Sequence, residues 1–192
     1  MSQGVLTNLP AREPGADPVL RTYPWSDAAV LGLVSALAYA VKSHYSTATA
    51  EELRWALVPT TYLVEAITGL HFTFERGAGF VSDSRHLVIA PACAGVNFFV
   101  IALLSLSFGF VPELGTKARK VALAFAFALS AYVAMVVVNA LRISLHVLLT
   151  AHVRFAEPIR EQAHRVEGVV TYLTALFVLM AAARACLGGT RR

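Results

Sequence analysis

The chain has 192 residues, of which 57% are hydrophobic and only 15% are charged, and its mean hydropathy is +0.62. A soluble domain of this size needs more polar side chains to cover its own surface, so the composition excludes that class and predicts an integral membrane protein. The net charge of +4 is small, and membrane orientation explains it better than binding to nucleic acid, for which we see no signature.

Residues 1–26 are predicted to form a flexible cytoplasmic tail. They contain four prolines and two arginines and lack both an apolar core and a small-residue cleavage site, which argues against a signal peptide. Residues 27–192 are predicted to form a single integral membrane domain. The first apolar run, 28–41, is short, and we count it as a membrane span because it can be extended at either end.

The next two segments predict elements that do not cross the membrane. Arg54, Pro59 and Glu65 interrupt residues 51–70, which therefore predict an interfacial or half-buried helix. Residues 71–90 combine alternating aromatic residues, glycines, a polar turn and a β-branched run. This pattern predicts a short extracytoplasmic β-hairpin.

Three later runs, 91–111, 121–141 and 166–187, reach the length of about 20 residues that a membrane helix requires. The fold class is therefore an all-α membrane protein, a multi-pass bundle of four to five membrane helices with one half-buried helix and the short hairpin. The alternative of five spans arises if residues 51–70 cross the bilayer, which would move the N-terminus outside and leave the rest unchanged.

Basic residues set the orientation of the later spans. The short loop after residue 111 carries Lys117, Arg119 and Lys120, and the end of the chain carries three arginines, so both belong in the cytoplasm. The outer ends of the three later spans consequently face the extracytoplasmic side.

Cys93 stands at the outer end of the first of these runs, just after Pro91. Proline suits the first turn of a helix, so Cys93 is predicted to lie among the unpaired N–H groups of a helix N-terminus, a setting that favours a thiolate. Cys186 belongs to the inner end of the last run, about 30 Å away and beyond disulfide reach. Cys93 is thus predicted to be free and reactive, with a buried structural cysteine as the alternative and as the expectation for Cys186.

A polar stripe marks the outer end of the run 121–141. Asn139, Arg142 and His146 fall on one face of an otherwise apolar helix, which predicts a functional site. The alternative is that Arg142 reaches out to the membrane surface without a further role.

A histidine completes the set of candidate site residues. His164 falls in the first turn of the last span, and Gly168 one turn later allows close helix packing. A cysteine nucleophile needs a nearby base, which His164 can supply, with His146 in reserve. Asn97, one turn after Cys93, and Asn139 are candidates to orient the site.

The ordered motifs Pro-Ala-Cys-Ala-Gly, Asn-Ala-Leu-Arg-Ile and a histidine followed four residues later by glycine resemble the exosortase/archaeosortase family. Within that family the compact size and the sequence Cys-Ala-Gly-Val-Asn-Phe look most like the small exosortase K-type branch. Many exosortases have Cys-Ser-Gly followed by Leu-Arg, whereas this chain has Ala94, Val96 and Asn97 at those places.

The resemblance implies a membrane-embedded cysteine protease or transpeptidase of the bacterial inner membrane, with its active site on the periplasmic side. Cys93 matches the family's nucleophile, Arg142 its arginine and His164 its histidine. The implied substrate is a C-terminal sorting signal of an exported protein, made of a Pro-containing motif, a membrane helix and a basic tail. No cofactor is implied.

Two other classes compete with this interpretation. A metal enzyme ranks low, because the sequence has no His-Glu-x-x-His motif and no paired ligand spacing, and we predict no metal site. A non-enzymatic transporter or envelope-assembly factor is the main alternative. That class predicts polar residues in the middle of the spans, whereas here they cluster at the outer ends.

Overall fold

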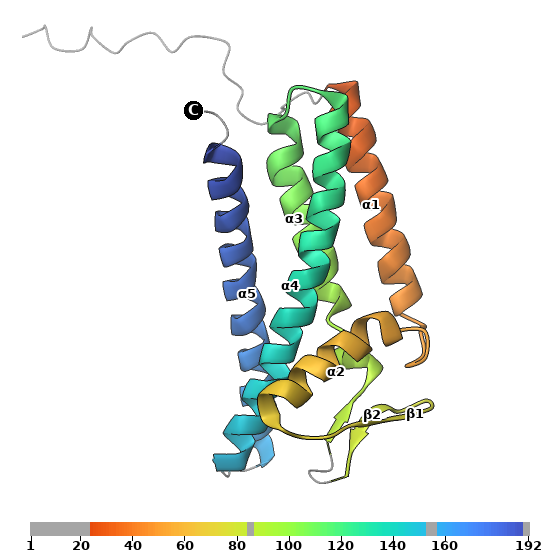
Figure 1. Cartoon of the computed structure of the whole chain (residues 1–192), viewed down its shortest axis with the longest axis vertical. Helices are drawn as coiled ribbons and strands as arrows, with labels where there is room; N and C mark the ends of the chain where they lie inside the picture. The colour runs from red at the N-terminus through yellow and green to blue at the C-terminus, as the bar shows by residue number, and fades with distance from the viewer. Residues whose placement is uncertain (1–23, 84–86, 153–156, 190–192) are drawn as a thin grey trace, which may run out of the picture.

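The computed structural model describes residues 24–83, 87–152 and 157–189, and for residues 150–152, 157–165 and 189 it describes the backbone only. In chain order the elements are α1 (Trp25–Tyr45), α2 (Arg54–Thr68), β1 (Thr73–Glu75), β2 (Gly79–Ser82), β3 (Leu87–Ile89), η1 (Pro91–Cys93), α3 (Val96–Phe110), η2 (Val111–Glu113), α4 (Lys117–His152) and α5 (Glu157–Gly189). Four helices, α1, α3, α4 and α5, run along the long axis, while α2 and the strands gather at one end (Figure 1).

Three segments are long and apolar enough to cross a membrane: Pro91–Glu113, Lys117–Leu149 and Val166–Gly188. They confirm the three later runs predicted from the sequence, although α4 continues well past the predicted end at residue 141 and is 36 residues long. The run 28–41 does form a helix, α1, of 21 residues, but α1 does not belong to these three. Within the described residues the predicted number of four to five spans is therefore not confirmed.

The first described helix begins close to the predicted start of the membrane domain. Helix α1 begins at Trp25, two residues before the expected start at residue 27, because the chain turns into the helix at Pro24, whose carbonyl accepts the N–H of Asp27 at 2.8 Å. Residues 1–23 of the predicted tail lie outside the described residues.

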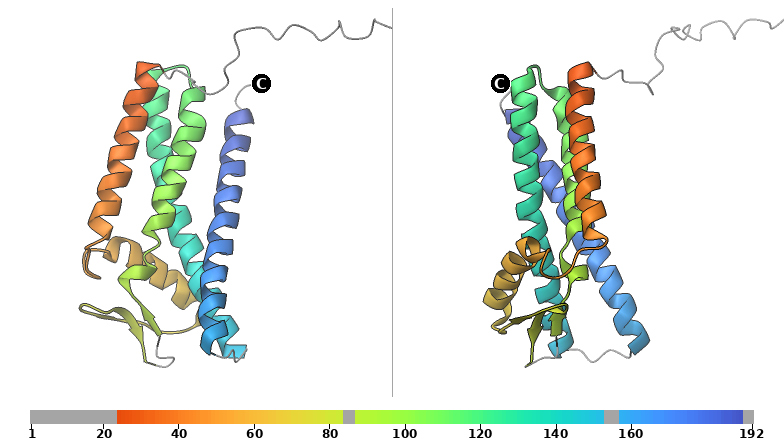
Figure 2. Two further views of the ribbon diagram at one scale, coloured as in Figure 1. Left: turned by 180° about the vertical axis from the view of Figure 1, so that it is seen from behind. Right: turned by 90° about the vertical axis from the view of Figure 1, so that its right-hand side faces the viewer.

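Helix α2 lies across the end of the bundle against α4 (Figures 1 and 2). Its 15 residues span about 22 Å at 1.5 Å per residue, which is less than the hydrocarbon thickness of about 30 Å. One face is buried, including Leu57, Thr60 and Val64, while Tyr62 on the other face is 68% exposed. The segment is thus a half-buried helix, as its interrupted apolar pattern predicts.

A hydrogen bond from α4 satisfies the backbone carbonyl that the proline in α2 leaves unpaired. Pro59 has no N–H, so the carbonyl of Trp55 four residues earlier has no partner within the helix. The hydroxyl of Tyr132 on α4 donates to that carbonyl at 2.8 Å, and the rings of Tyr132 and Trp55 stack at 5.9 Å. The carbonyl that Pro59 leaves without a helical partner therefore links α2 to α4.

The predicted hairpin is a three-stranded antiparallel sheet in the order β1-β2-β3. A third strand extends the predicted hairpin, because the β-branched run at residues 88–89 pairs with the free edge of β2, where Phe80 faces Ile89. This pairing requires a glycine at position 79, whose φ is +113° and where a Cβ would collide with the carbonyl oxygen of Ile89. The carboxylate of Glu51 accepts the N–H of Gly77 at 3.1 Å, and its own backbone N–H and that of Gly77 lower its pKa.

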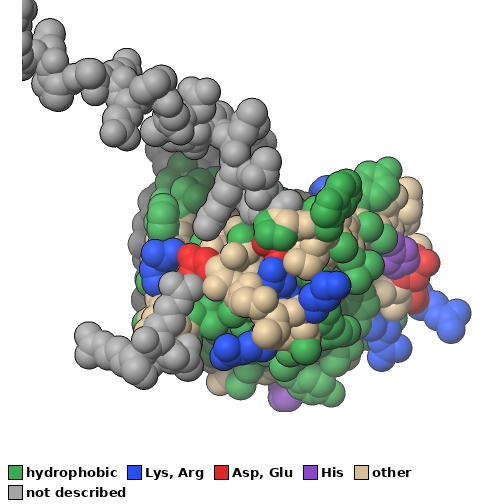
Figure 3. All heavy atoms as spheres, turned by 90° about the horizontal axis from the view of Figure 1, so that it is seen from above, with side chains coloured by type: hydrophobic (Ala, Val, Ile, Leu, Met, Phe, Trp, Pro, Cys, Tyr) green, Lys and Arg blue, Asp and Glu red, His purple; other side chains and the backbone are tan. Residues whose placement is uncertain are grey.

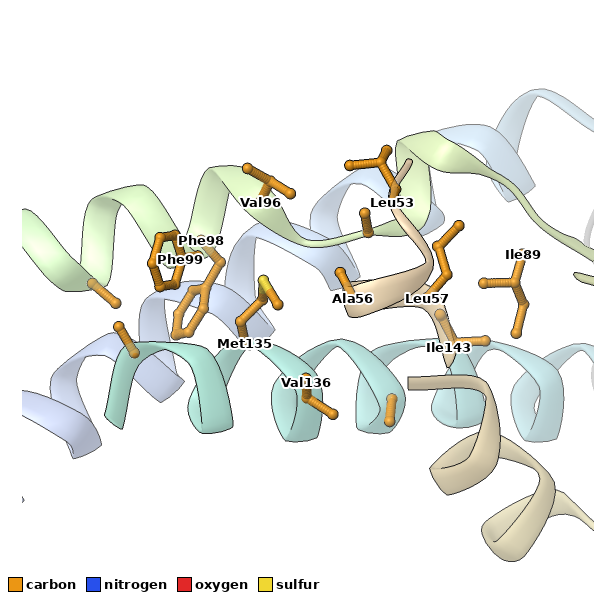
Figure 4. Close-up of a cluster of buried hydrophobic side chains, with 14 of the residues drawn as sticks. Leu53, Ala56, Leu57, Ile89, Val96, Phe98, Phe99, Met135, Val136 and Ile143 are labelled. Atoms are coloured by element: carbon orange, nitrogen blue, oxygen red, sulfur yellow. The ribbon is translucent and has the colours of Figure 1, made fainter. Parts of the chain in front are cut away.

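The main core lies where α2, α3 and α4 meet (Figure 4). Its labelled members are Leu53, Ala56, Leu57, Ile89, Val96, Phe98, Phe99, Met135, Val136 and Ile143. Membrane helices associate mainly through close van der Waals packing, and the packing of this cluster fixes the residues on both sides of Cys93. The core therefore holds residues 89–96 between α2 and α4.

Ion pairs connect the helices at the end of the bundle remote from Cys93. Asp27 on α1 and Lys120 on α4 form an ion pair with side chains only 2% and 6% exposed, and Lys120 also approaches the hydroxyl of Ser26 at 3.4 Å. Arg184 on α5 pairs with Glu113 at 3.3 Å. Viewed from this end, Lys and Arg side chains lie among polar atoms, with hydrophobic side chains around them (Figure 3).

Candidate active site

Cys93 lies in a separate turn that precedes α3. Residues Pro91–Cys93 form a single 3-10 turn, in which the N–H of Cys93 donates to the carbonyl of Ala90 at 2.8 Å. The prediction that Cys93 sits among the unpaired N–H groups of the membrane helix is therefore wrong, because its own N–H is paired and the helix begins three residues later. The thiol is half-buried and free.

Gly95 separates this turn from the helix. Its φ of +73° places it in the left-handed region, where glycine is favoured over other residues. A Cβ at this position would lie 3.1 Å from Cγ of Met135 and 3.3 Å from Cβ of Asn139. The break in the helix is thus set by the close approach of α4, and it turns the carbonyl of Cys93 toward that helix.

Asn139 connects the cysteine turn with two other helices. Its side chain is completely buried. The Nδ2 group donates to the backbone carbonyl of Cys93, and Oδ1 accepts the hydroxyl of Tyr172 on α5 at 3.0 Å. The first residue of the predicted polar stripe therefore holds the backbone of the candidate nucleophile.

Arg142, one turn further along α4, packs against α5. Its guanidinium carbon lies 5.3 Å from the centre of the Tyr172 ring, and Nη1 lies 3.4 Å from the position of a Cβ on Gly168. The side chain is therefore held between the helices and does not simply extend to the membrane surface. Its Nε is buried and has no hydrogen-bond partner among the described residues.

The two candidate histidines belong to different helices, His146 to α4 and His164 to α5, and these two helices contact each other. Nδ1 of His146 lies 3.5 Å from a carboxylate oxygen of Glu167, and both side chains are largely buried. His164 lies in α5 one turn before Gly168, and its side chain is outside the described residues. The structure thus places His146 beside Glu167 and gives the helix position of His164 alone.

Asn97 lies in the first turn of α3 and faces α1. Its exposed side chain accepts the ammonium of Lys42 at 2.6 Å, and Lys42 lies 5.1 Å from the ring centre of Tyr45. Tyr45 and Cys93 both pack against the main core cluster. Asn97 is therefore joined to the site through the end of α1.

Sequence reasoning missed four residues of this region, namely Lys42, Tyr45, Glu167 and Tyr172. A signal existed for the last of these, because Tyr172 follows His164 and Gly168 at intervals of four residues and so shares their face of α5. No such pattern marks Lys42 or Tyr45, which reach the site only because α1 ends beside α3.

The second cysteine takes no part in this arrangement. Cys186 lies near the other end of α5 and is exposed, so the prediction of a buried structural cysteine is wrong there. Four of the five residues before it, 181–185, are alanines, and only 6% of the apolar window of this helix is buried, so the thiol stays uncovered. Among the described residues, no group of three His, Cys, Asp or Glu side chains could hold a metal ion.

The chain is thus an integral membrane protein, a helical bundle in which the turn of the free Cys93 is joined to α4 through Asn139. Residues 46–181 match the family described as Transmembrane exosortase (Exosortase_EpsH). This match covers more than half of the chain, which therefore belongs to the transmembrane exosortase family. Membership supports a membrane transpeptidase-type function in protein sorting. No curated protein and no solved structure matches the chain.

Proposed function

We propose that this chain is a cysteine transpeptidase that cleaves C-terminal sorting signals of exported proteins at the extracytoplasmic face of the bacterial inner membrane. Cys93 is the nucleophile, Arg142 stabilises the oxyanion and His164 is the acid-base residue. The substrate carries a Pro-containing motif, a membrane helix and a basic tail. Asn139 and Asn97 orient the catalytic residues, and His146 is a further residue that supports the site or binds substrate.

The observation that carries the proposal is the junction at Asn139. It links Cys93 of one sequence motif to the Asn-Arg motif of α4, and through Tyr172 to the helix that carries His164. Three short motifs that lie far apart in the sequence thereby belong to one end of the bundle. Buried backbone carbonyls need a partner, and the partner of the Cys93 carbonyl comes from the motif that also contains Arg142.

The first half of the reaction forms a thioester. His164 accepts the thiol proton, and the sulfur of Cys93 attacks the scissile carbonyl carbon. The carbonyl oxygen becomes an oxyanion, which Arg142 stabilises in surroundings of low polarity. The C–N bond then breaks, and His164 returns the proton to the leaving amine.

The unpaired Nε of Arg142 supports its assigned role. A buried donor without an acceptor costs about 1–3 kcal/mol, and in the described residues nothing accepts this N–H. An oxygen of the bound substrate would supply the missing acceptor. The second half of the reaction transfers the acyl group from sulfur to water or to an amine, which regenerates the thiol.

The proposed topology has four membrane helices, α1, α3, α4 and α5, with α2 at the surface and the N-terminus in the cytoplasm. The end that carries Lys117 and Lys120 lies inside, since basic residues favour the cytoplasmic side. The sheet and Cys93 are then outside. Helix α1 supports this count because its 21 residues run beside α3 and α4 (Figure 2).

The test is processing of a co-expressed exported protein that ends in the sorting signal described above. Cys93→Ser should insert and accumulate normally, because the two side chains are similar in volume, but processing should stop because a hydroxyl ionises far less readily than a thiol. Cys186→Ala is the matched control and should process normally. Full processing by Cys93→Ser would remove the peptidase proposal and favour a non-enzymatic assembly factor.

A further inference from the structure

We propose that Tyr172 is a positioning residue that sets both the cysteine turn and the arginine of the site. The inference rests on the proposed function, because its consequence is a rate of acyl transfer. Tyr172 is contributed by α5, whereas the groups that it holds belong to α4 and to the cysteine turn before α3. One side chain thus fixes the relative placement of three helices at the reacting end of the bundle.

The hydroxyl of Tyr172 acts on the cysteine through Asn139. It donates to Oδ1 at 3.0 Å, and the other end of the same amide donates to the carbonyl of Cys93. Because Asn139 is fully buried, loss of the hydroxyl leaves Oδ1 without a partner. We then expect the side-chain amide of Asn139 to rotate toward another hydrogen-bond donor. This rotation breaks the hydrogen bond to the carbonyl of Cys93.

The ring of Tyr172 acts on the arginine directly. The guanidinium carbon of Arg142 lies 5.3 Å from the ring centre, within the range of a cation–π contact. The ring also stacks on Phe98 of α3 at 5.3 Å with an angle of 26° between the planes. The Tyr172 ring on α5 therefore contacts α3 through Phe98 and Arg142 of α4.

Substitutions of Tyr172 can test the hydroxyl contact with Asn139 and the ring contact with Arg142 separately. Tyr172→Phe removes the hydroxyl and keeps the ring, whereas Tyr172→Leu removes both. A structural control is available in Tyr132→Phe, since Tyr132 also lies on a membrane helix and its hydroxyl donates to a backbone carbonyl, that of Trp55, at 2.8 Å. The control loses one tyrosine hydroxyl hydrogen bond of similar length, at a more exposed place outside the cysteine network.

Two measurements are made in the Cys186→Ala background, so that Cys93 is the one thiol left. The first is kcat and KM for processing of the sorting-signal substrate. The second, which needs no substrate, is the rate at which a membrane-impermeant maleimide alkylates Cys93. Tyr172→Phe should lower kcat about five- to tenfold, as expected for one buried hydrogen bond, with KM unchanged, and should change the alkylation rate at least threefold. Tyr132→Phe should leave both within twofold of the parent.

A double-mutant cycle tests whether the hydroxyl acts through Asn139. Tyr172→Phe combined with Asn139→Ala should have the same kcat as Asn139→Ala alone. Tyr172→Leu should lose about threefold or more beyond Tyr172→Phe, because the contact with Arg142 is also gone. Multiplicative losses in the cycle would overturn the link through Asn139, and equal kcat for the Phe and Leu variants would overturn the link to Arg142.

The outcomes also distinguish this inference from the proposed function. If Cys93→Ser still processes the substrate, the peptidase proposal fails, yet the alkylation rates still report whether Tyr172 positions Cys93. If Cys93 proves essential and Tyr172→Phe matches the parent in both measurements, the positioning role is refuted alone. An equal loss of kcat in Tyr132→Phe would likewise refute it, because the effect would then be one of general stability.

Discussion

Replacement of Gly95 by alanine should damage the site more than the same replacement at any other described glycine outside the sheet. The backbone at Gly95 has φ +73°, a conformation that costs an L-residue about 1–2 kcal/mol. The new Cβ would also lie 3.1 Å from Met135 and 3.3 Å from Asn139, both in the buried core. Overpacking of a core costs about 1–3 kcal/mol more, so we expect a total of about 2–5 kcal/mol.

Gly69 provides the matched control. Its φ is +70°, and a Cβ there would meet nothing within 4 Å. Gly69→Ala should therefore show the backbone cost of about 1–2 kcal/mol without the steric cost, and it should process substrate normally. The difference between the two variants isolates the contact between Gly95 and α4.

The free energy of unfolding can be measured for both variants by titration of the purified protein in mixed micelles with a denaturing detergent, followed by circular dichroism. Processing is assayed in parallel with the co-expressed substrate. Equal stability of Gly95→Ala and Gly69→Ala, together with normal processing by Gly95→Ala, would show that the left-handed break does not position Asn139 and Cys93.

Two further predictions concern charged and titratable residues. His164→Ala should abolish processing while His146→Ala, which loses a partner of Glu167, should reduce it partially or not at all, and the reverse order in the same assay would move the base to α4. Lys120→Met should destabilise the protein by about 3–5 kcal/mol, because it leaves the buried carboxylate of Asp27 unpaired. The double variant Asp27→Leu with Lys120→Met should recover much of that loss in the detergent titration, and no recovery would show that the charges are not coupled.

The long apolar helices could be predicted because their signal is local. Length and composition alone placed the runs 91–111, 121–141 and 166–187, and the lipid-facing side chains of α5 leave that signal undisturbed, as with Phe177 at 73% exposure. The polar stripe of α4 was equally visible, since Asn139 and Arg142 stand out from apolar neighbours on one helical face.

The break before α3 could not be predicted in the same way. Glycine at position 95 is compatible with a continuous helix, and only the approach of Met135 and Asn139 from α4 selects the left-handed conformation. The role of Tyr172 depends on the rotation of α5 about its axis, which periodicity does not determine. The third strand could not be predicted for a related reason. The local sequence around Ile89 does not determine that this residue pairs with Phe80.

The buried pair of Asp27 and Lys120 has a consequence for biosynthesis. The two residues are 93 positions apart, so at 5–20 residues per second the carboxylate emerges about 5 to 20 s before its cation is made. Until then α1 has no cation against which to bury Asp27, and the carboxylate is more stable in water at the membrane surface. The end of the bundle remote from Cys93 therefore closes only after Lys120 at the start of α4 has been synthesised.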